Sequence, residues 1–176
     1  MKRNLLVLAF KALINGPVTT KYPFKPSPAP EGFRGRPEYD PEKCTGCGAC
    51  VEVCPSGSIT RLESQGKRTV SLWYGKCTFC ARCEEVCPEK AIKLTRDFEL
   101  ATFDKEHLTE KVEIEMVRCE RCGNWLTTAR IIDKVKAIPR ELKLDAETLE
   151  RTMMLCPKCR REVEASILLG LSEKKL

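Results

Sequence analysis

Twelve cysteines dominate the chemistry available to this 176-residue chain, and their spacing is regular. Eight of them fall in two runs of the form C-x-x-C-x-x-C-x-x-x-C-P, which are 33 residues apart, from Cys44 to Cys77. The first run contains Cys44, Cys47, Cys50 and Cys54, and the second contains Cys77, Cys80, Cys83 and Cys87. Thiolates are soft ligands that bind iron–sulfur clusters and single zinc or iron ions. The doubled run therefore predicts two related metal centres.

The doubled run has the ligand pattern of bacterial-type ferredoxins with two [4Fe-4S] clusters, in which the fourth cysteine of each run binds the other cluster. We expect the same crossing here. One cluster takes Cys44, Cys47, Cys50 and Cys87, and the other takes Cys77, Cys80, Cys83 and Cys54. A degenerate repeat that binds zinc is the alternative. It fits less well, because both runs match the pattern without a deviation.

The other four cysteines form a third candidate site. Cys119 and Cys122 lie in a C-x-x-C-G sequence, and Cys156 and Cys159 lie in a C-P-x-C sequence. Four thiolates at such knuckles hold one ion tetrahedrally, either zinc as in zinc ribbons or iron as in rubredoxin-like sites. The sequence favours a structural zinc slightly over iron. Since four protein ligands fill the coordination sphere, we expect this site to fold the C-terminal lobe and not to bind substrate.

The composition limits the environment and the partners of the chain. A secreted disulfide scaffold is a poor explanation for the cysteines, because their spacings are metal-ligand spacings and no cleavable signal is evident, so a reducing interior is implied. The formal charge of +6 and the pI near 8.7 could indicate nucleic-acid binding. Twelve thiolates and the bound metal together bring the loaded protein close to neutrality, however. A nucleic-acid-binding zinc-ribbon protein is therefore the least favoured hypothesis.

Three segments are expected in an α+β protein. Residues 1–38 should form an amphipathic helix followed by a proline-rich docking strap, because 4–14 is mainly apolar and six prolines follow within 17–37. A secretory signal is the alternative for the first part, but Lys11 interrupts the apolar run. Eleven helical residues span about 16 Å, too little for a bilayer core of about 30 Å.

Residues 39–103 should form a ferredoxin domain with a short helix before each fourth cysteine. Gly46 and Gly48 should let the backbone approach the first cluster. Strands are expected at 59–62 and 69–74 around a turn at 64–67, and 91–94 repeats the position of 58–61. Residues 104–176 should form a helical lobe on the four-cysteine site. Its helices are expected at 126–138, 145–154 and 160–171.

No pattern indicates catalysis by this polypeptide alone. His107 is the only histidine and stands in a charged, surface-like stretch, so we assign it no role. The chain shows no nucleophile–base constellation and no glycine-rich phosphate loop. Its single Gln and three Asn, with 32% charged residues, are typical of thermophilic proteins.

The chain resembles the two-cluster ferredoxin subunit of respiratory complex I. The resemblance rests on Tyr22-Pro23, on Phe33-Arg34-Gly35-Arg36-Pro37, on the run from Arg82 to Pro88 and on Phe98-Glu99-Leu100-Ala101. The added knuckles at Cys119/Cys122 and Cys156/Cys159 make the chain more similar to the small iron–sulfur subunit of formate hydrogenlyase and related membrane-bound [NiFe] hydrogenases.

This resemblance implies a non-catalytic subunit that relays electrons through two [4Fe-4S] clusters toward a [NiFe] hydrogenase module. Its implied partners are the hydrogenase small and large subunits, the membrane-arm subunits and an upstream dehydrogenase or ferredoxin-like donor. Its implied place is peripheral, on the cytoplasmic side of the membrane. The alternatives are a relay subunit of another complex I-like oxidoreductase and a soluble ferredoxin-type carrier. The sequence does not distinguish formate, carbon monoxide or ferredoxin as the electron source, nor the direction of electron flow.

Overall fold

The computed structural model describes residues 5–17, 19–137 and 152–168, and it divides the chain into two compact units, Met1–Phe33 and Arg34–Leu176. Each unit is described by itself. The helix predicted at 145–154 lies mostly outside the described residues.

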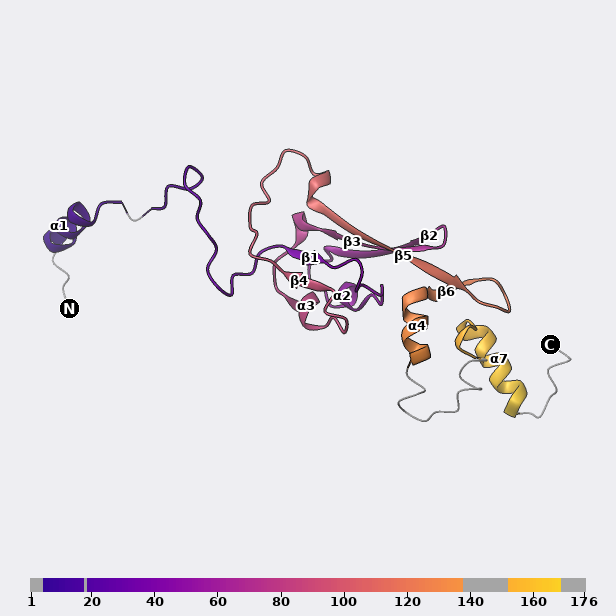
Figure 1. Ribbon diagram of the computed structural model, residues 1–176. Coiled ribbons are helices and arrows are strands. Elements are labelled where there is room, and N and C mark those ends of the chain that lie inside the picture. The colour runs from indigo at the N-terminus through magenta and orange to yellow at the C-terminus, as the bar shows by residue number, and fades with distance from the viewer. Residues whose placement is uncertain (1–4, 18, 138–151, 169–176) are drawn as a thin grey trace. The chain divides into compact units, whose positions relative to one another are not determined.

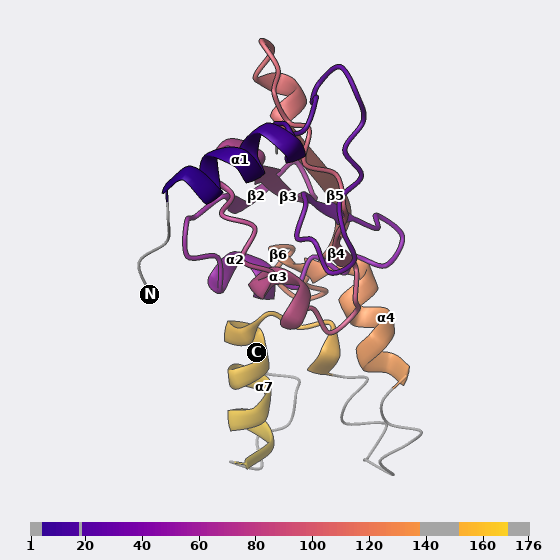
Figure 2. The same cartoon turned by 90° about the vertical axis from the view of Figure 1, so that its left-hand side faces the viewer.

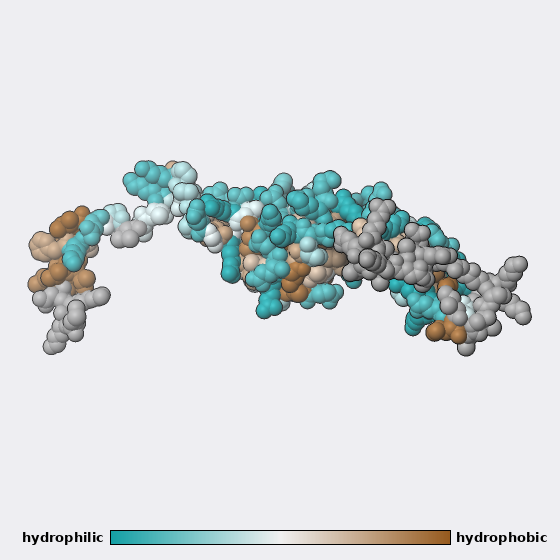
Figure 3. All heavy atoms as spheres, turned by 60° about the horizontal axis from the view of Figure 1, so that its bottom comes forward, coloured by the Kyte–Doolittle hydropathy of each residue, from teal (hydrophilic) through white to brown (hydrophobic). Residues whose placement is uncertain are grey.

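The first unit contains helix α1 (Leu5–Asn15), as predicted. None of its residues is buried, and its large apolar side chains lie in solvent, from Leu5 at 84% exposure to Ile14 at 80%. Figure 3 shows this helix as a group of hydrophobic side chains. The described part of the proline-rich segment that follows, within 17–33, contains neither helix nor strand. Within the described residues, no helix is long and apolar enough to cross a membrane.

The second unit is built on a four-stranded antiparallel sheet in the order β2-β3-β5-β6. Its strands are β2 (Ile59–Ser64), β3 (Lys67–Trp73), β5 (Thr109–Arg118) and β6 (Trp125–Thr128). The predicted hairpin between β2 and β3 is confirmed. Its two turn residues, Gln65 and Gly66, have φ of 50° and 83°, as a tight turn between twisted strands requires.

The sheet continues into the segment that was expected to be a helical lobe. Strand β5 buries Val112, Ile114 and Met116 and pairs with β3 along its length, so the predicted lobe shares a sheet with the ferredoxin part. The helix expected to start at Leu126 was predicted too early. Residues 125–128 form β6, and helix α4 (Ala129–Ala137) follows. Pairing with β5 and the β-branched residues Thr127 and Thr128 favour the strand.

Two short helices lie against one face of this sheet. They are α2 (Ala49–Glu52) and α3 (Arg82–Glu85), one before each fourth cysteine, as predicted. Both views of the chain show them beside each other, next to a two-stranded antiparallel ribbon of β1 (Pro37–Tyr39) and β4 (Ile92–Leu94) (Figures 1 and 2). Two 3₁₀ turns, at Tyr74–Lys76 and Glu106–Leu108, precede α3 and β5.

A hydrophobic core joins the sheet to the ribbon. Cysteines of both runs pack against it. Its buried members are Tyr39, Cys44, Ile59, Val70, Leu72, Tyr74, Ala91, Ile92, Val112 and Ile114. A second, smaller cluster forms around Cys119, Leu155, Cys156 and Cys159. It includes the start of helix α7 (Pro157–Leu168), which begins three residues earlier than predicted.

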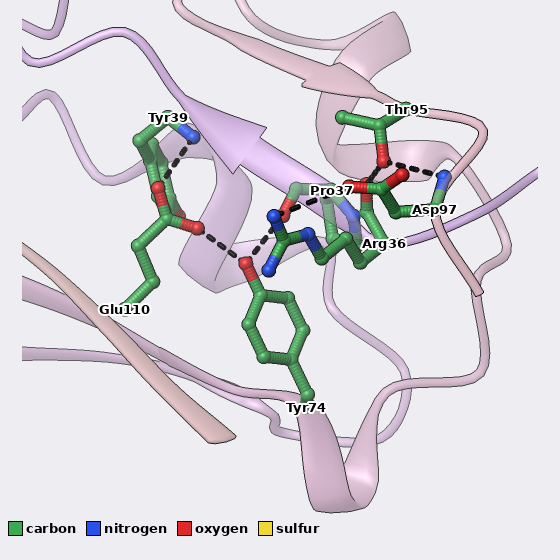
Figure 4. A network of polar contacts seen from close by, with 7 residues as sticks. All are labelled: Arg36, Pro37, Tyr39, Tyr74, Thr95, Asp97 and Glu110. Atoms are coloured by element: carbon green, nitrogen blue, oxygen red, sulfur yellow. Dashed lines mark hydrogen bonds and ion pairs between the residues drawn. The ribbon is translucent and has the colours of Figure 1, made fainter. Parts of the chain in front are cut away.

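Glu110, near the start of β5, links this strand to β1 through hydrogen bonds (Figure 4). One carboxylate oxygen accepts the backbone N–H of Tyr39 at 2.9 Å, and the other contacts the hydroxyl of Tyr74. That hydroxyl also lies 2.8 Å from the carbonyl oxygen of Pro37. Burial, and then the hydrogen bond to Glu110, raise the pKa of Tyr74 well above its usual value, so the hydroxyl remains a donor. This network fixes the strand that leads into the first cysteine run.

The two residues before β1 remain hydrogen-bonded to the segment that follows β4. Gly35 N–H donates to Thr95 O at 2.9 Å, and Arg36 N–H donates to Asp97 O at 2.8 Å. The side chains of Arg36 and Asp97 form an ion pair of 3.2 Å (Figure 4). The pairing leaves no room beside Gly35, where a Cβ atom would lie 2.3 Å from the carbonyl oxygen of Asp97.

We therefore expect Gly35→Ala to destabilise the second unit by roughly 1–3 kcal/mol, because only backbone movement can relieve the overlap. The measurement is the midpoint of thermal unfolding, followed by circular dichroism. Gly57→Ala is the comparison. A Cβ there meets nothing within 4 Å and suffers only the strain of a φ of 61°, so its midpoint should fall less. Equal midpoints for Gly35→Ala and the unmodified protein would contradict the packing described.

Candidate metal centres

The eight cysteines of the doubled run surround two cavities. One cavity is lined by Cys44, Cys47, Cys50 and Cys87. The other is lined by Cys54, Cys77, Cys80 and Cys83. We call them the first and second cavities. Each combines three cysteines of one run with the last cysteine of the other, which is the grouping that the crossed pattern predicts.

The four cysteines of each cavity do not form one of the described groups whose ligand atoms lie close enough together to hold one ion. Among the described residues, which include all twelve cysteines, only one group of three or more potential ligands has its ligand atoms within 4.8 Å of one another, and it is not in either cavity. Four thiolates spread around an open space suit a multi-iron cluster better than one tetrahedral ion. All twelve cysteines are free, so no disulfide uses them. The donor set and its arrangement around each cavity thus fit a [4Fe-4S] cluster.

Left-handed backbone turns shape both cysteine loops. In the first loop, Gly46 and Gly48 have φ of 70° and 85°, and a Cβ at Gly48 would lie 2.5 Å from Nη1 of Arg61. The second loop adopts the same turns with Phe79 at 52° and Ala81 at 68°. Residues with a Cβ are strained in this region, which glycine occupies freely. The second loop therefore reaches the same shape at an energetic cost that its surroundings must offset.

The two cavities differ in the groups that donate to their cysteine sulfurs. In the second cavity, the hydroxyls of Ser58 and Ser56 lie 3.2 and 3.6 Å from Sγ of Cys54. In the first, the backbone N–H of Ala91 donates to Sγ of Cys87 at 3.2 Å, and the Tyr39 hydroxyl lies 3.6 Å from Sγ of Cys50. A thiolate that binds iron can only accept, so each hydroxyl must donate to it.

These environments shift the pKa values of the thiols. Burial alone raises the pKa of Cys54, but the hydroxyls of Ser58 and Ser56 and nearby backbone N–H groups bring it down to about 7. Burial raises the pKa of Cys83 to about 12 and also raises the pKa of Cys44, Cys50 and Cys77. Cys54 is therefore the cysteine whose surroundings most favour the thiolate form in the second cavity.

Ser58→Ala is expected to lower the reduction potential of the cluster in the second cavity. A hydroxyl that donates to a ligating sulfur stabilises the more negative, reduced state, and a hydrogen bond to a charged group contributes roughly 1.5–3 kcal/mol. The measurement is an EPR-monitored redox titration of the full chain. Ser56→Ala, which removes the longer contact, should have the smaller effect. An unchanged potential in Ser58→Ala would show that the hydroxyl does not donate to the ligand.

The third group brings the last four cysteines together. The sulfurs of Cys119, Cys122, Cys156 and Cys159 all lie within 4.8 Å of one another, close enough for one ion. The backbone N–H of Cys156 donates to Sγ of Cys119 at 3.2 Å, and that of Cys159 approaches Sγ of Cys156 at 3.5 Å. Cys119, Cys156 and Cys159 are buried.

Backbone donors at this site offset the effect of burial. Burial raises the pKa of the Cys119 thiol, but N–H groups of Cys122, Cys156 and Arg121 bring it down to about 6, and the Cys159 N–H lowers the pKa of Cys156. Burial, and then the neighbouring thiols, raise the pKa of Cys159 to about 12. Four thiols in this arrangement repel as thiolates unless a cation joins them, so the geometry and the donor set fit a tetrahedral metal ion.

Comparison with known proteins identifies the family. A 4Fe-4S dicluster domain matches residues 38–94, which contain both cysteine runs. Formate hydrogenlyase subunit 6 of Escherichia coli (strain K12) is 36% identical over 156 residues, which cover 86% of this chain and 86% of that protein. The chain belongs to the formate hydrogenlyase subunit 6 family of 4Fe-4S dicluster subunits.

Members of this family are related to subunit I of the NAD(P)H-quinone oxidoreductases. That subunit in Prochlorococcus marinus (strain AS9601) is 42% identical to this chain over 112 residues, which cover 60% of this chain and 54% of that protein. A chain in the structure of the membrane-bound sulfane sulfur reductase, an archaeal respiratory membrane complex, is 31% identical over 61% of both chains. The TM-score between the two chains is 0.44.

The side chains that contact the cysteines of the two cavities were not predicted from the sequence. Ser58, Tyr39 and Arg130 contact the cysteines or their loops, and none was expected to do so. The Ser58 position was visible in the repeat, because the offset of 33 residues places it opposite Ala91. His107 lies at the surface, as predicted, and its Nε2 atom is 3.4 Å from Oδ2 of Asp104.

Proposed function

We propose that this chain is a non-catalytic electron-transfer subunit of a membrane-bound complex of the formate hydrogenlyase or [NiFe] hydrogenase type. In this proposal, Cys44, Cys47, Cys50 and Cys87 hold one [4Fe-4S] cluster, and Cys54, Cys77, Cys80 and Cys83 hold the other. Clusters of this kind store and pass on single electrons. The residues of the chain hold them near one shared core and tune them through hydrogen bonds.

The length of the alignment with formate hydrogenlyase subunit 6 carries this proposal. An alignment that covers 86% of the chain must extend well beyond residue 103, into the part that contains β5, β6 and the third cysteine group. The alignment with the quinone oxidoreductase subunit covers only 60% of the chain. This difference favours a hydrogenlyase-type complex over a complex I-like oxidoreductase.

Helix α1 supports a role inside a larger assembly. Its large apolar side chains are exposed in the chain by itself. A helix that exposes so much apolar surface is stable only when that surface is covered, by protein or by lipid. We infer that α1 and the proline-rich segment after it dock this subunit at the membrane face of the complex. A freely diffusing ferredoxin-type carrier has no use for such a helix.

The third site completes the proposal. The four cysteines Cys119, Cys122, Cys156 and Cys159 hold a single zinc or iron ion that organises the C-terminal segment. The small hydrophobic cluster around these residues is too small to stabilise the segment by itself, and small domains of this kind usually need a metal.

The test is purification of the tagged full chain from membranes of its native host after gentle solubilisation. The proposal predicts co-purification of hydrogenase large and small subunits and membrane-arm subunits, with nickel present in addition to iron. A variant with Leu5, Leu13 and Ile14 changed to serine should lose the membrane fraction and keep its clusters. Recovery of the unmodified chain as a monomer outside the membrane fraction would overturn the proposal.

A further inference from the structure

Arg130 in helix α4 reaches across to the loop that opens the first cysteine run. Its Nη1 atom donates to the carbonyl oxygen of Cys44 at 2.7 Å and also contacts the carbonyl oxygen of Pro41. The two carbonyls lie 86 and 89 residues away along the chain. Since Cys44 lines the first cavity, Arg130 acts directly on the backbone that presents one of its cysteines.

Two further side chains hold the next carbonyl oxygens of the same loop. The hydroxyl of Thr128, which is fully buried at the end of β6, donates to Thr45 O at 2.6 Å. Nη1 of the buried Arg68 in β3 donates to Gly46 O at 3.0 Å. With their carbonyls held outward in this way, the peptide groups of the loop keep a fixed orientation next to the cavity.

Helix α4 also contacts the other side of the first cavity. Lys134, one turn after Arg130, forms an ion pair with Glu89. Glu89 lines the first cavity and follows Cys87 by two residues. One helix therefore contacts the loop of Cys44 and the segment that brings Cys87 in from the second run.

The cations around this cavity differ in how their charges are balanced. Arg68 pairs with Glu63 at 2.8 Å, and Lys134 pairs with Glu89. Arg130 donates instead to carbonyl oxygens, which carry only partial negative charge. A positive charge near a cluster stabilises its reduced, more negative state, and the effect is larger where the surroundings are partly buried.

We propose that Arg130 is a positioning residue that holds the loop of the first cavity and raises the reduction potential of the cluster bound there. The inference rests on the proposed function in one respect, the binding of a cluster in each cavity. It assigns to α4, which lies outside the matched dicluster domain at 38–94, a direct part in setting the properties of one cluster.

The test is an EPR-monitored redox titration of the full chain, purified anaerobically with its clusters, as the unmodified protein and as Arg130→Gln and Arg130→Lys. Cys47→Ala and Cys80→Ala, which each retain one cluster, identify the two signals. Lys136→Gln is the control, because it removes an exposed positive charge from the same helix. The cluster of the second cavity is an internal reference.

In Arg130→Gln the reduction equilibrium of the first cluster should become about tenfold less favourable, which is a fall of about 59 mV for one electron. The reduction potential of the second cluster in Arg130→Gln should change by less than a third of this. The potentials of both clusters in Lys136→Gln should also change by less than a third of it. Because Arg130→Lys keeps the positive charge, the reduction potential of its first cluster should stay close to that of the unmodified protein. If Arg130→Gln loses the first cluster, retention of the second supports the holding role, and loss of both overturns it.

If the reduction potential of the first cluster is unchanged in Arg130→Gln, or if the potentials of both clusters shift equally, the inference is overturned while the proposed function stays intact. The absence of two cluster signals in the unmodified protein would instead overturn the proposed function on which the inference rests.

Discussion

Cys87→Ala is expected to abolish the cluster that the first run holds, although Cys87 belongs to the second run. Cys87 lines the first cavity with Cys44, Cys47 and Cys50, and the backbone N–H of Ala91 donates to its sulfur at 3.2 Å. With three thiolates left, the site loses a quarter of its protein ligands, and we expect about half of the iron of the chain to be lost. The measurements are iron content per chain and the EPR spectrum after reduction.

Pairs of variants make this test specific. Cys87→Ala and Cys47→Ala should leave the same residual spectrum, because both remove a ligand of the first cavity. Cys54→Ala and Cys80→Ala should share the other residual spectrum, because both line the second. If Cys87→Ala instead resembled Cys80→Ala, each run would hold its own cluster, and the crossed assignment would be wrong.

Cys159→Ala should release the ion of the third site and unfold the segment around it. Metal binding at structural four-thiolate sites contributes about 10–16 kcal/mol of folding free energy, so the loss of one buried ligand has a large effect. We expect metal analysis to show about one ion fewer per chain, and hydrogen exchange to show lost protection in α7 (Pro157–Leu168). The iron of the two clusters should remain.

Lys158→Ala is the matched control for this change. Lys158 lies between Cys156 and Cys159 but is exposed and offers no thiolate, so its substitution should leave the ion and the protection of α7 in place. An unaltered metal content in Cys159→Ala would exclude the site as assigned. The same analysis identifies the ion as zinc or iron.

The way in which the cysteines come together could be predicted from the sequence, because cysteine spacing limits which side chains can meet. The two runs predicted the grouping of cysteines that the cavities show. The β2–β3 hairpin was also predictable, because Gln65-Gly66 lies between two β-branched segments.

Other features depend on contacts between residues that are far apart along the chain. Strand β6 is only four residues long and exists because β5 pairs with it, so local propensity alone suggested a helix from Leu126. Strand β5 does carry a strand pattern, with Val112, Ile114 and Met116 separated by charged residues, but no element was predicted there. The contact of Arg130 with Cys44 spans 86 residues and has no sequence signal.

In the function proposed above, this chain binds two [4Fe-4S] clusters that carry electrons. The most direct measurement is iron and inorganic sulfide analysis of the anaerobically purified full chain, together with EPR spin quantitation after reduction. We expect about eight iron atoms and eight sulfides in the clusters, and two reducible centres of one unpaired electron each. A chain that contains only zinc, or iron without inorganic sulfide and without a reducible signal, would contradict it.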